Sequence, residues 1–149
     1  SGFAHQGQGH EAIRCLQMMQ SEGLSPDKIT FLCVLNACSH SGLLDTGQLY
    51  FHIMSSFYGL MPTLEHYTCM VDLLSRAGLY RKAIDAIEQV QASDRLPLLL
   101  ALLGTCNEYI NVEIGRWAFE CSIQLDEDNA AAYVCMSNIY TDTDIYRED

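Results

Sequence analysis

The 149-residue sequence predicts an all-α fold, a right-handed superhelical α-solenoid built from helix-turn-helix repeats. The first observation behind this prediction is an internal repeat, because Gly7, Gly42 and Gly78 lie 35 and 36 residues apart. Each of them is followed five residues later by another small residue, namely Ala12, Gly47 and Ala83. A period of this length is typical of stacked supersecondary units, none of which can bury its apolar face alone.

Two further observations extend the repeat and identify its units as helical. One slot is shared by four apolar residues at steps of 36, 32 and 34, namely Phe31, Tyr67, Leu99 and Tyr133. Within the units, apolar or small residues recur with the i, i+3, i+4, i+7 spacing of a helix, starting at Phe31 and again at Tyr67. We therefore expect about eight helices, two in each unit.

The elements of the first half follow from this register. Residues 2–4 indicate the end of one helix, and residues 10–21 indicate a second. The next units, 28–63 and 64–95, each place a glycine between two helices, where a left-handed conformation ends the first helix. Gly47 and Ala83 should lie where the two helices of one unit touch.

The second half continues the pattern less regularly. The apolar run 96–103 is too short to span a membrane and predicts a buried helix with Pro97 in its first turn. Residues 129–140 predict another first helix, and a second should begin within 141–149. Neither end resembles a capping unit, so we expect the natural protein to extend in both directions.

Composition limits the possible functions. Eight basic residues against nineteen acidic ones give a net charge of −11, which argues against strong, self-sufficient nucleic-acid binding by this chain. The seven cysteines contain no C-x-x-C pair, so we expect reduced, structural cysteines and no metal or cofactor. Cys38 and Cys106 occupy equivalent repeat positions, where a small residue lets helices approach.

Several stretches resemble a known family. Residues 26–43, with PDKITF and LNACSHSGL, resemble a long-type pentatricopeptide repeat, and residues 64–78, LEHYTCMVDLLSRAG, are similar to the short-type repeat that ends such arrays. Residues 111–116 and 132–140 resemble the two E motifs that follow. The resemblance implies a plant organellar pentatricopeptide protein of the PLS class, a group associated with C-to-U editing of transcripts.

The resemblance also implies a division of the chain. It gives a partial repeat at 1–27, a long repeat at 28–63, a short repeat at 64–95, a first E motif at 96–129 and a partial second E motif at 130–149. The chain departs from the family before the first E motif, where Leu99 occupies the slot of a tryptophan. This departure puts base recognition by the closing residue of the short repeat in doubt.

Pentatricopeptide arrays bind single-stranded RNA with one repeat per base. In the family, the fifth and last residues of each repeat choose the base, which implies contacts by Asp27, Leu32, Thr63, Thr68 and Asp94, with Arg95 as an alternative to Asp94. Leu32 has no hydrogen-bonding group and should discriminate little, whereas Thr68 with an acidic partner resembles a guanine-favouring pair. Thr68 could equally be an ordinary solvated helix position.

No catalytic role is expected from the sequence. A zinc nucleobase deaminase needs a His-x-Glu element and a Cys-x-x-Cys, and neither occurs. Any deaminase domain would therefore lie beyond Asp149.

The acidic terminal third fits a protein-docking extension better than a phosphate-binding groove. The resemblance implies that it docks an editing-factor protein, such as a multiple organellar editing factor, or a deaminase domain, with Trp117 and Tyr140 as candidate contacts. Trp117 could instead pack between the helices of the first E motif. We expect no membrane association, and localisation in the mitochondrion or the chloroplast, the mitochondrion being the first choice.

The alternative function is a tetratricopeptide-like scaffold that binds proteins and no RNA. Its repeats would keep a constant period of about 34 residues. The unequal units of this chain, 28–63 and 64–95, favour the RNA-binding interpretation. Further alternating repeats upstream of Ser1 would decide between the two.

Overall fold

The computed structural model describes the backbone of residues 2–148 and the side chains of residues 9–143. Within that range the chain forms eight α-helices and one short 3-10 helix, and no strand. The elements are α1 (Gly2–Ser21), α2 (Lys28–Ser41), α3 (Leu44–Ser56), α4 (Leu64–Arg76), α5 (Tyr80–Glu88), η1 (Ala92–Asp94), α6 (Leu96–Tyr109), α7 (Val112–Leu125) and α8 (Ala130–Glu148). The predicted all-α fold and the predicted number of helices are confirmed.

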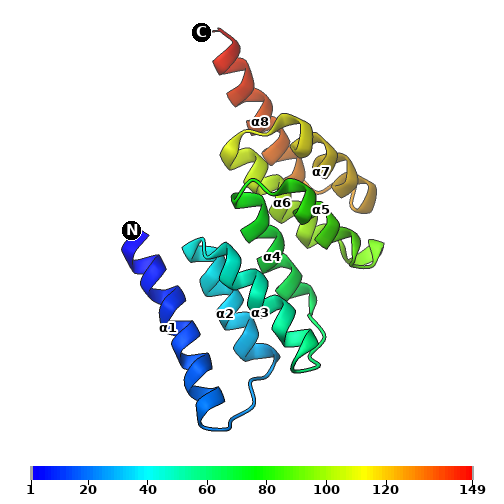
Figure 1. Cartoon of the computed structure of the whole chain (residues 1–149). Coiled ribbons are helices and arrows are strands. Elements are labelled where there is room, and N and C mark those ends of the chain that lie inside the picture. Colours follow the sequence, from blue (N-terminus) through cyan, green and yellow to red (C-terminus); the bar gives the residue numbers. More distant parts are fainter. Residues whose placement is uncertain (1, 149) are drawn as a thin grey trace.

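The helices form a stack of helix-turn-helix units. Helices α2, α4, α6 and α8 make one layer, in which each helix packs against the next (Figure 1). Helices α3, α5 and α7 lie on one side of that layer, and each contacts the layer helix before it and the one after it. Helix α1 also packs against α2, and Gln20 near its end donates a hydrogen bond to the hydroxyl of Tyr58, just after α3.

Inside the units, the first helix ends at a glycine, as the sequence predicts. Gly42 and Gly78 adopt the left-handed conformation, with φ of 70° and 79°. The same slot after α6 holds Ile110, which also has a positive φ of 53°. A β-branched residue is strained in this region, so the turn holds Ile110 in a backbone conformation that isoleucine disfavours.

Two expected helix boundaries are wrong. Residues 2–4 and 10–21 were expected to belong to different helices, but α1 is continuous through Gly7 and Gly9. Likewise α8 continues through residues 141–148, where a new helix should begin. A glycine inside a helix costs only about 1 kcal/mol, so Gly7 and Gly9 permit a turn in α1 without requiring one.

The apolar core runs along the stack as two clusters that meet at α4. One face of α4 packs Cys69, Met70 and Leu73 toward α2 and α3, and another packs Val71 and Leu74 toward α5 and α6. Because one helix serves both clusters, neighbouring units share a continuous core. This is the nearest-neighbour packing expected of a solenoid.

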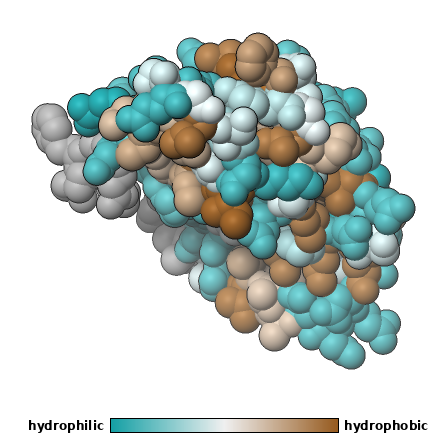
Figure 2. Space-filling model, turned by 90° about the horizontal axis from the view of Figure 1, so that it is seen from below, coloured by the Kyte–Doolittle hydropathy of each residue, from teal (hydrophilic) through white to brown (hydrophobic). Residues whose placement is uncertain are grey.

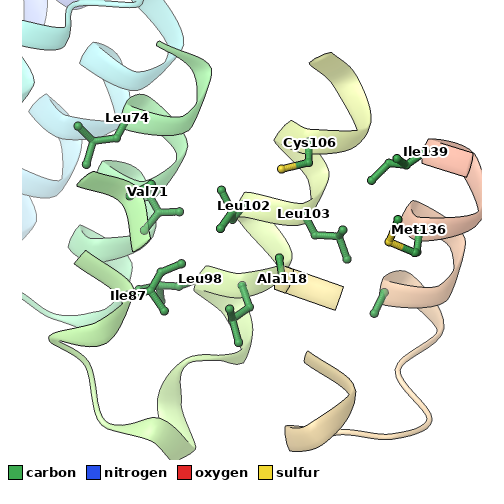
Figure 3. Close-up of a cluster of buried hydrophobic side chains, with 13 residues drawn as sticks. Val71, Leu74, Ile87, Leu98, Leu102, Leu103, Cys106, Ala118, Met136 and Ile139 are labelled. Atoms are coloured by element: carbon green, nitrogen blue, oxygen red, sulfur yellow. The ribbon is translucent and has the colours of Figure 1, made fainter. Parts of the chain in front are cut away.

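Helix α6 is the centre of the second cluster. It begins as predicted, with a proline in its first turn, and buries Leu98, Leu99, Leu102 and Leu103. Figure 3 shows Leu102 directed toward α4 and Leu103 toward α8. Leucines on two faces of this helix therefore join the units before and after it.

The small residues mark close approaches between helices. A Cβ added to Gly47 of α3 would overlap Leu73 Cδ2 of α4 and come within 3.4 Å of Cys38 Cβ of α2. The predicted contact inside the unit 28–63 is therefore confirmed, and Ala83 is fully buried in the second cluster. Gly115 of α7 repeats the arrangement, because its added Cβ would lie 3.3 Å from Cys106 Cβ.

All seven cysteines are free thiols. Burial raises the pKa of Cys38 to about 11 and that of Cys106 to about 12, so both stay protonated at neutral pH. Within the described residues, no three His, Cys, Asp or Glu side chains are grouped to hold a metal ion. No helix in that part of the chain combines the length and apolarity needed to cross a membrane.

Candidate nucleic-acid interface

A groove follows the line where α2 and α4 meet. Two adjoining hollows form it, and both are lined only by residues of these two helices and of the N-cap of α4. We name it the α2–α4 groove; its residues are Lys28, Ile29, Leu32, Asn36, Thr63, Leu64, Glu65, His66, Thr68 and Cys69. Because no residue of α1, α3 or α5 contributes, the groove opens on the side of the layer opposite α3.

The groove combines an apolar floor with a few polar groups. Ile29, Leu32 and Leu64 supply apolar side chains, and Ile29 is 71% exposed. Lys28 and Glu65 bring one charge of each sign. Apolar surface with sparse polar groups at its edge suits a flat, heteroaromatic ligand.

His66 fixes the geometry of the groove from below. Its side chain is 1% exposed, and its Nδ1 accepts a hydrogen bond from the Thr63 backbone N–H at 3.0 Å. Its Nε2 lies 2.9 Å from the Lys28 carbonyl oxygen, to which it donates when Nδ1 is the acceptor. The buried imidazole therefore ties the start of α4 to the start of α2.

The structure brings three of the five predicted RNA-contacting residues together. Leu32 and Thr63, the pair assigned to the long repeat, line the same hollow. Leu32 and Thr68 line the adjoining hollow. The Thr68 hydroxyl donates to the Leu64 carbonyl at 2.9 Å, which leaves its oxygen free to accept.

The other two predicted residues lie outside the groove. Asp94 is exposed in η1, between α5 and α6. The alternative residue, Arg95, donates hydrogen bonds to the carbonyls of Val90 (2.8 Å) and Glu88 (3.0 Å), so it closes the end of α5. Arg95 lines a different hollow from Thr68, together with Ile87 and Trp117.

Asp27 caps helix α2. Its Oδ1 accepts hydrogen bonds from the Thr30 backbone N–H and the Thr30 hydroxyl, each at 2.9 Å. These hydrogen bonds hold the pKa of Asp27 below its ordinary value of 3.8. Much of its carboxylate is therefore used by its own helix.

This cap predicts a pH dependence of stability. Because the folded-state pKa of Asp27 is lowered, its contribution is fully present above pH 3.8 and is lost as the pH falls through the folded-state pKa. Asp27→Asn keeps a capping oxygen but does not titrate. In urea unfolding at a series of pH values, the wild-type chain should lose stability relative to Asp27→Asn only in acid. Asp128→Asn serves as the control substitution. If the stabilities of the wild-type chain and of Asp27→Asn change in parallel with pH, Asp27 does not have this role.

The two candidate protein contacts lie in the C-terminal third. Trp117 of α7 is half-buried and lines a hollow with Ile87 and Arg95, so it packs largely between helices. Tyr140 of α8 is 41% exposed, and its hydroxyl accepts a hydrogen bond from Arg116 Nε at 3.1 Å. Other exposed apolar residues in this third of the chain include Tyr109, Leu125, Tyr133 and Val134.

Seven of the ten groove residues were not predicted as site residues, among them Asn36, Glu65 and His66. Asn36 Oδ1 accepts from Cys69 Sγ at 3.1 Å, and His66 bonds across to Lys28. A spacing signal did exist, because Glu65 precedes Thr68 by three positions and Asn36 follows Leu32 by four. Both therefore share a helix face with a predicted contact residue.

Comparisons with known proteins agree with the repeat architecture. Residues 1–24 and 65–94 match the family described as "PPR repeat", the pentatricopeptide repeat. A pentatricopeptide repeat-containing protein of Arabidopsis thaliana is 42% identical over 141 residues, which are 95% of this chain and 19% of that protein. A second, named as mitochondrial, is 39% identical over 148 residues, 99% of this chain and 24% of that protein. The chain thus spans about a fifth of the length of these relatives.

Proposed function

We propose that this chain, a plant pentatricopeptide-repeat protein by its matched repeats and its relatives, binds single-stranded RNA along the α2–α4 groove. One observation carries the proposal. Leu32 and Thr63, the fifth and last residues of the long repeat, are 31 positions apart in sequence but line one hollow. A base seated there would meet both residues that the family uses for selection.

The groove suits a base chemically. Its apolar side chains would contact the face of the ring, and the Thr68 oxygen would accept a hydrogen bond from the edge of the next base. In the short repeat we propose Thr68 with Asp94 as a pair that favours guanine. Asp27, at the start of α2, would contribute at the preceding base only with the part of its carboxylate not engaged by Thr30.

Binding by this chain alone should be weak at physiological salt. The net charge is −11, and Lys28 is the one basic residue of the α2–α4 groove. Phosphate neutralisation by Lys and Arg supplies most sequence-independent affinity for nucleic acid, and that term falls as salt rises. Further repeats would have to supply the remaining phosphate contacts.

The finer proposal is a segment of an organellar C-to-U editing factor. In it, the repeats align the transcript, and residues 96–149 act as E motifs that recruit a deaminase or an editing cofactor. The described part of that segment, 96–143, carries seven acidic residues and one arginine. Its exposed aromatic residues, with Tyr140 the better placed of the two candidates, could anchor a protein partner. Two relatives named as mitochondrial support the mitochondrion, with the chloroplast as the alternative.

The two lysines of the chain provide a matched test of RNA binding. Lys28 lies in the groove, whereas Lys82 is exposed on α5, on the other side of the layer. Both Lys28→Glu and Lys82→Glu change the net charge by the same amount. At low ionic strength, Lys28→Glu should weaken binding of a labelled single-stranded RNA by about tenfold, as for one lost phosphate contact, and Lys82→Glu by much less.

Fluorescence anisotropy would measure these affinities. Equal losses in the two lysine variants would show that only the overall charge matters and would contradict binding in the groove. Tight, salt-resistant binding by this chain alone would contradict the proposed dependence on further repeats. A stable complex with an editing cofactor but none with any RNA would favour the scaffold alternative.

A further inference from the structure

Glu65 lies at the centre of the α2–α4 groove. It is not one of the repeat positions that the family uses for base selection. It lines both hollows, beside Leu32 in each and beside Thr68 in the second. Cys69 lines the second hollow as well, and the charge of Glu65 helps to raise its pKa, after burial and Asp72. Glu65 is nevertheless exposed and accessible to a ligand.

The carboxylate of Glu65 is available for binding. Among the residues that the structure describes, the ion pairs join Arg76 to Asp72 and Glu108, and Arg81 to Asp85. Glu65 takes part in none of them. An ionised carboxylate outside an ion pair can accept hydrogen bonds on both of its oxygens.

Asn36 supplies the opposite kind of group. Its amide oxygen accepts from Cys69 Sγ, so its NH2 group keeps both of its donors. The Thr68 hydroxyl donates its hydrogen bond to the Leu64 carbonyl, so toward a ligand it can only accept. The groove therefore presents a carboxylate acceptor and an amide donor above an apolar floor.

We infer that Glu65 selects guanine as the base seated over Leu32. This inference rests on the proposed function, namely that the groove binds single-stranded RNA. Guanine offers N1–H and N2–H side by side, and these can donate in parallel to the two oxygens of one carboxylate. Its O6 is an acceptor that can face the amide donor of Asn36.

The other bases match this arrangement less well. Adenine and cytosine each offer one amino group next to a ring nitrogen that accepts and would repel the carboxylate. Uracil offers one N3–H between two carbonyl oxygens, which also repel it. The long repeat would thus gain its selectivity from the first turn of the following helix, because Leu32 itself has no polar group.

Nuclear magnetic resonance titration with nucleoside 5′-monophosphates would test the inference. GMP should shift the amide signals around Leu32 and Glu65 and bind about fivefold or more tightly than AMP, CMP or UMP, in line with one bidentate pair. Glu65→Gln should reduce this preference to about twofold or less. The matched control is Glu113→Gln, because Glu113 lies in the first turn of α7 just as Glu65 lies in that of α4.

The possible failures are distinguishable. If Glu65→Gln strengthens binding of all four nucleotides equally, Glu65 only repels phosphate, and the inference is wrong while RNA binding stands. If single-stranded RNA shifts the groove signals but GMP shows no preference, the inference again fails alone. If neither RNA nor any mononucleotide shifts these signals at low ionic strength, both the inference and the proposed function fail. A titration with inorganic phosphate, which has no base, separates binding of the phosphate group from binding of the base.

Discussion

Replacing Leu102 with alanine should lower the free energy of unfolding by about 2–5 kcal/mol. The side chain is fully buried in the second core cluster, and it points from α6 toward α4 (Figure 3). Truncation removes apolar contact and leaves a cavity between two units, because the helices of a packed core relax only partially. Urea unfolding followed by circular dichroism would measure the change.

Leu49→Ala is the control for Leu102→Ala. Leu49 lies in α3 but is 53% exposed, so its truncation should change the free energy of unfolding by less than about 0.5 kcal/mol. Exposed apolar side chains such as Leu49 are ordinary on this molecule, and the view from below in Figure 2 shows apolar groups interspersed with hydrophilic ones. Equal losses in the two variants would mean that Leu102 does not join the units.

Gly47→Ala should destabilise the protein by about 1–3 kcal/mol. The added methyl group would overlap Leu73 Cδ2 and press on Cys38. Leu73 is 2% exposed and enclosed by the first core cluster, so it has little room to move away. The loss should exceed the gain of about 1 kcal/mol that alanine brings over glycine in a helix.

Gly104→Ala separates the two effects. Gly104 lies within α6, and a Cβ added to it meets no atom within 4 Å. This substitution should therefore raise the melting temperature through helix propensity alone. A rise in both variants would show that Gly47 is not a close contact between α2, α3 and α4.

Much of the fold is predictable from local patterns. The helical spacing that starts at Phe31 and Tyr67 marks α2 and α4 because both helices bury one face in a core shared with their neighbours. The failures lie at α1 and α8, where repeat register predicted a turn. A glycine such as Gly7 permits a turn, but only packing of a second helix against the first makes the turn more stable than a continuous helix.

The candidate site is predictable only in part. Family positions indicate Leu32, Thr63 and Thr68, and the structure places these along one groove. The roles of Glu65 and His66 depend on contacts between consecutive units, which no single repeat contains. His66 in particular is buried against a carbonyl of the preceding unit, at Lys28. Such a contact becomes visible only when α2 and α4 are packed together.

The most direct test is to locate RNA on the isotope-labelled chain. Titration with a short single-stranded RNA at low ionic strength should shift the amide signals of Leu32, Thr63 and Thr68. Signals on the opposite side of the layer, in α5 and α7, should stay in place. Shifts confined to α5 and α7, or the same shifts with double-stranded RNA, would contradict recognition of single-stranded RNA in the α2–α4 groove.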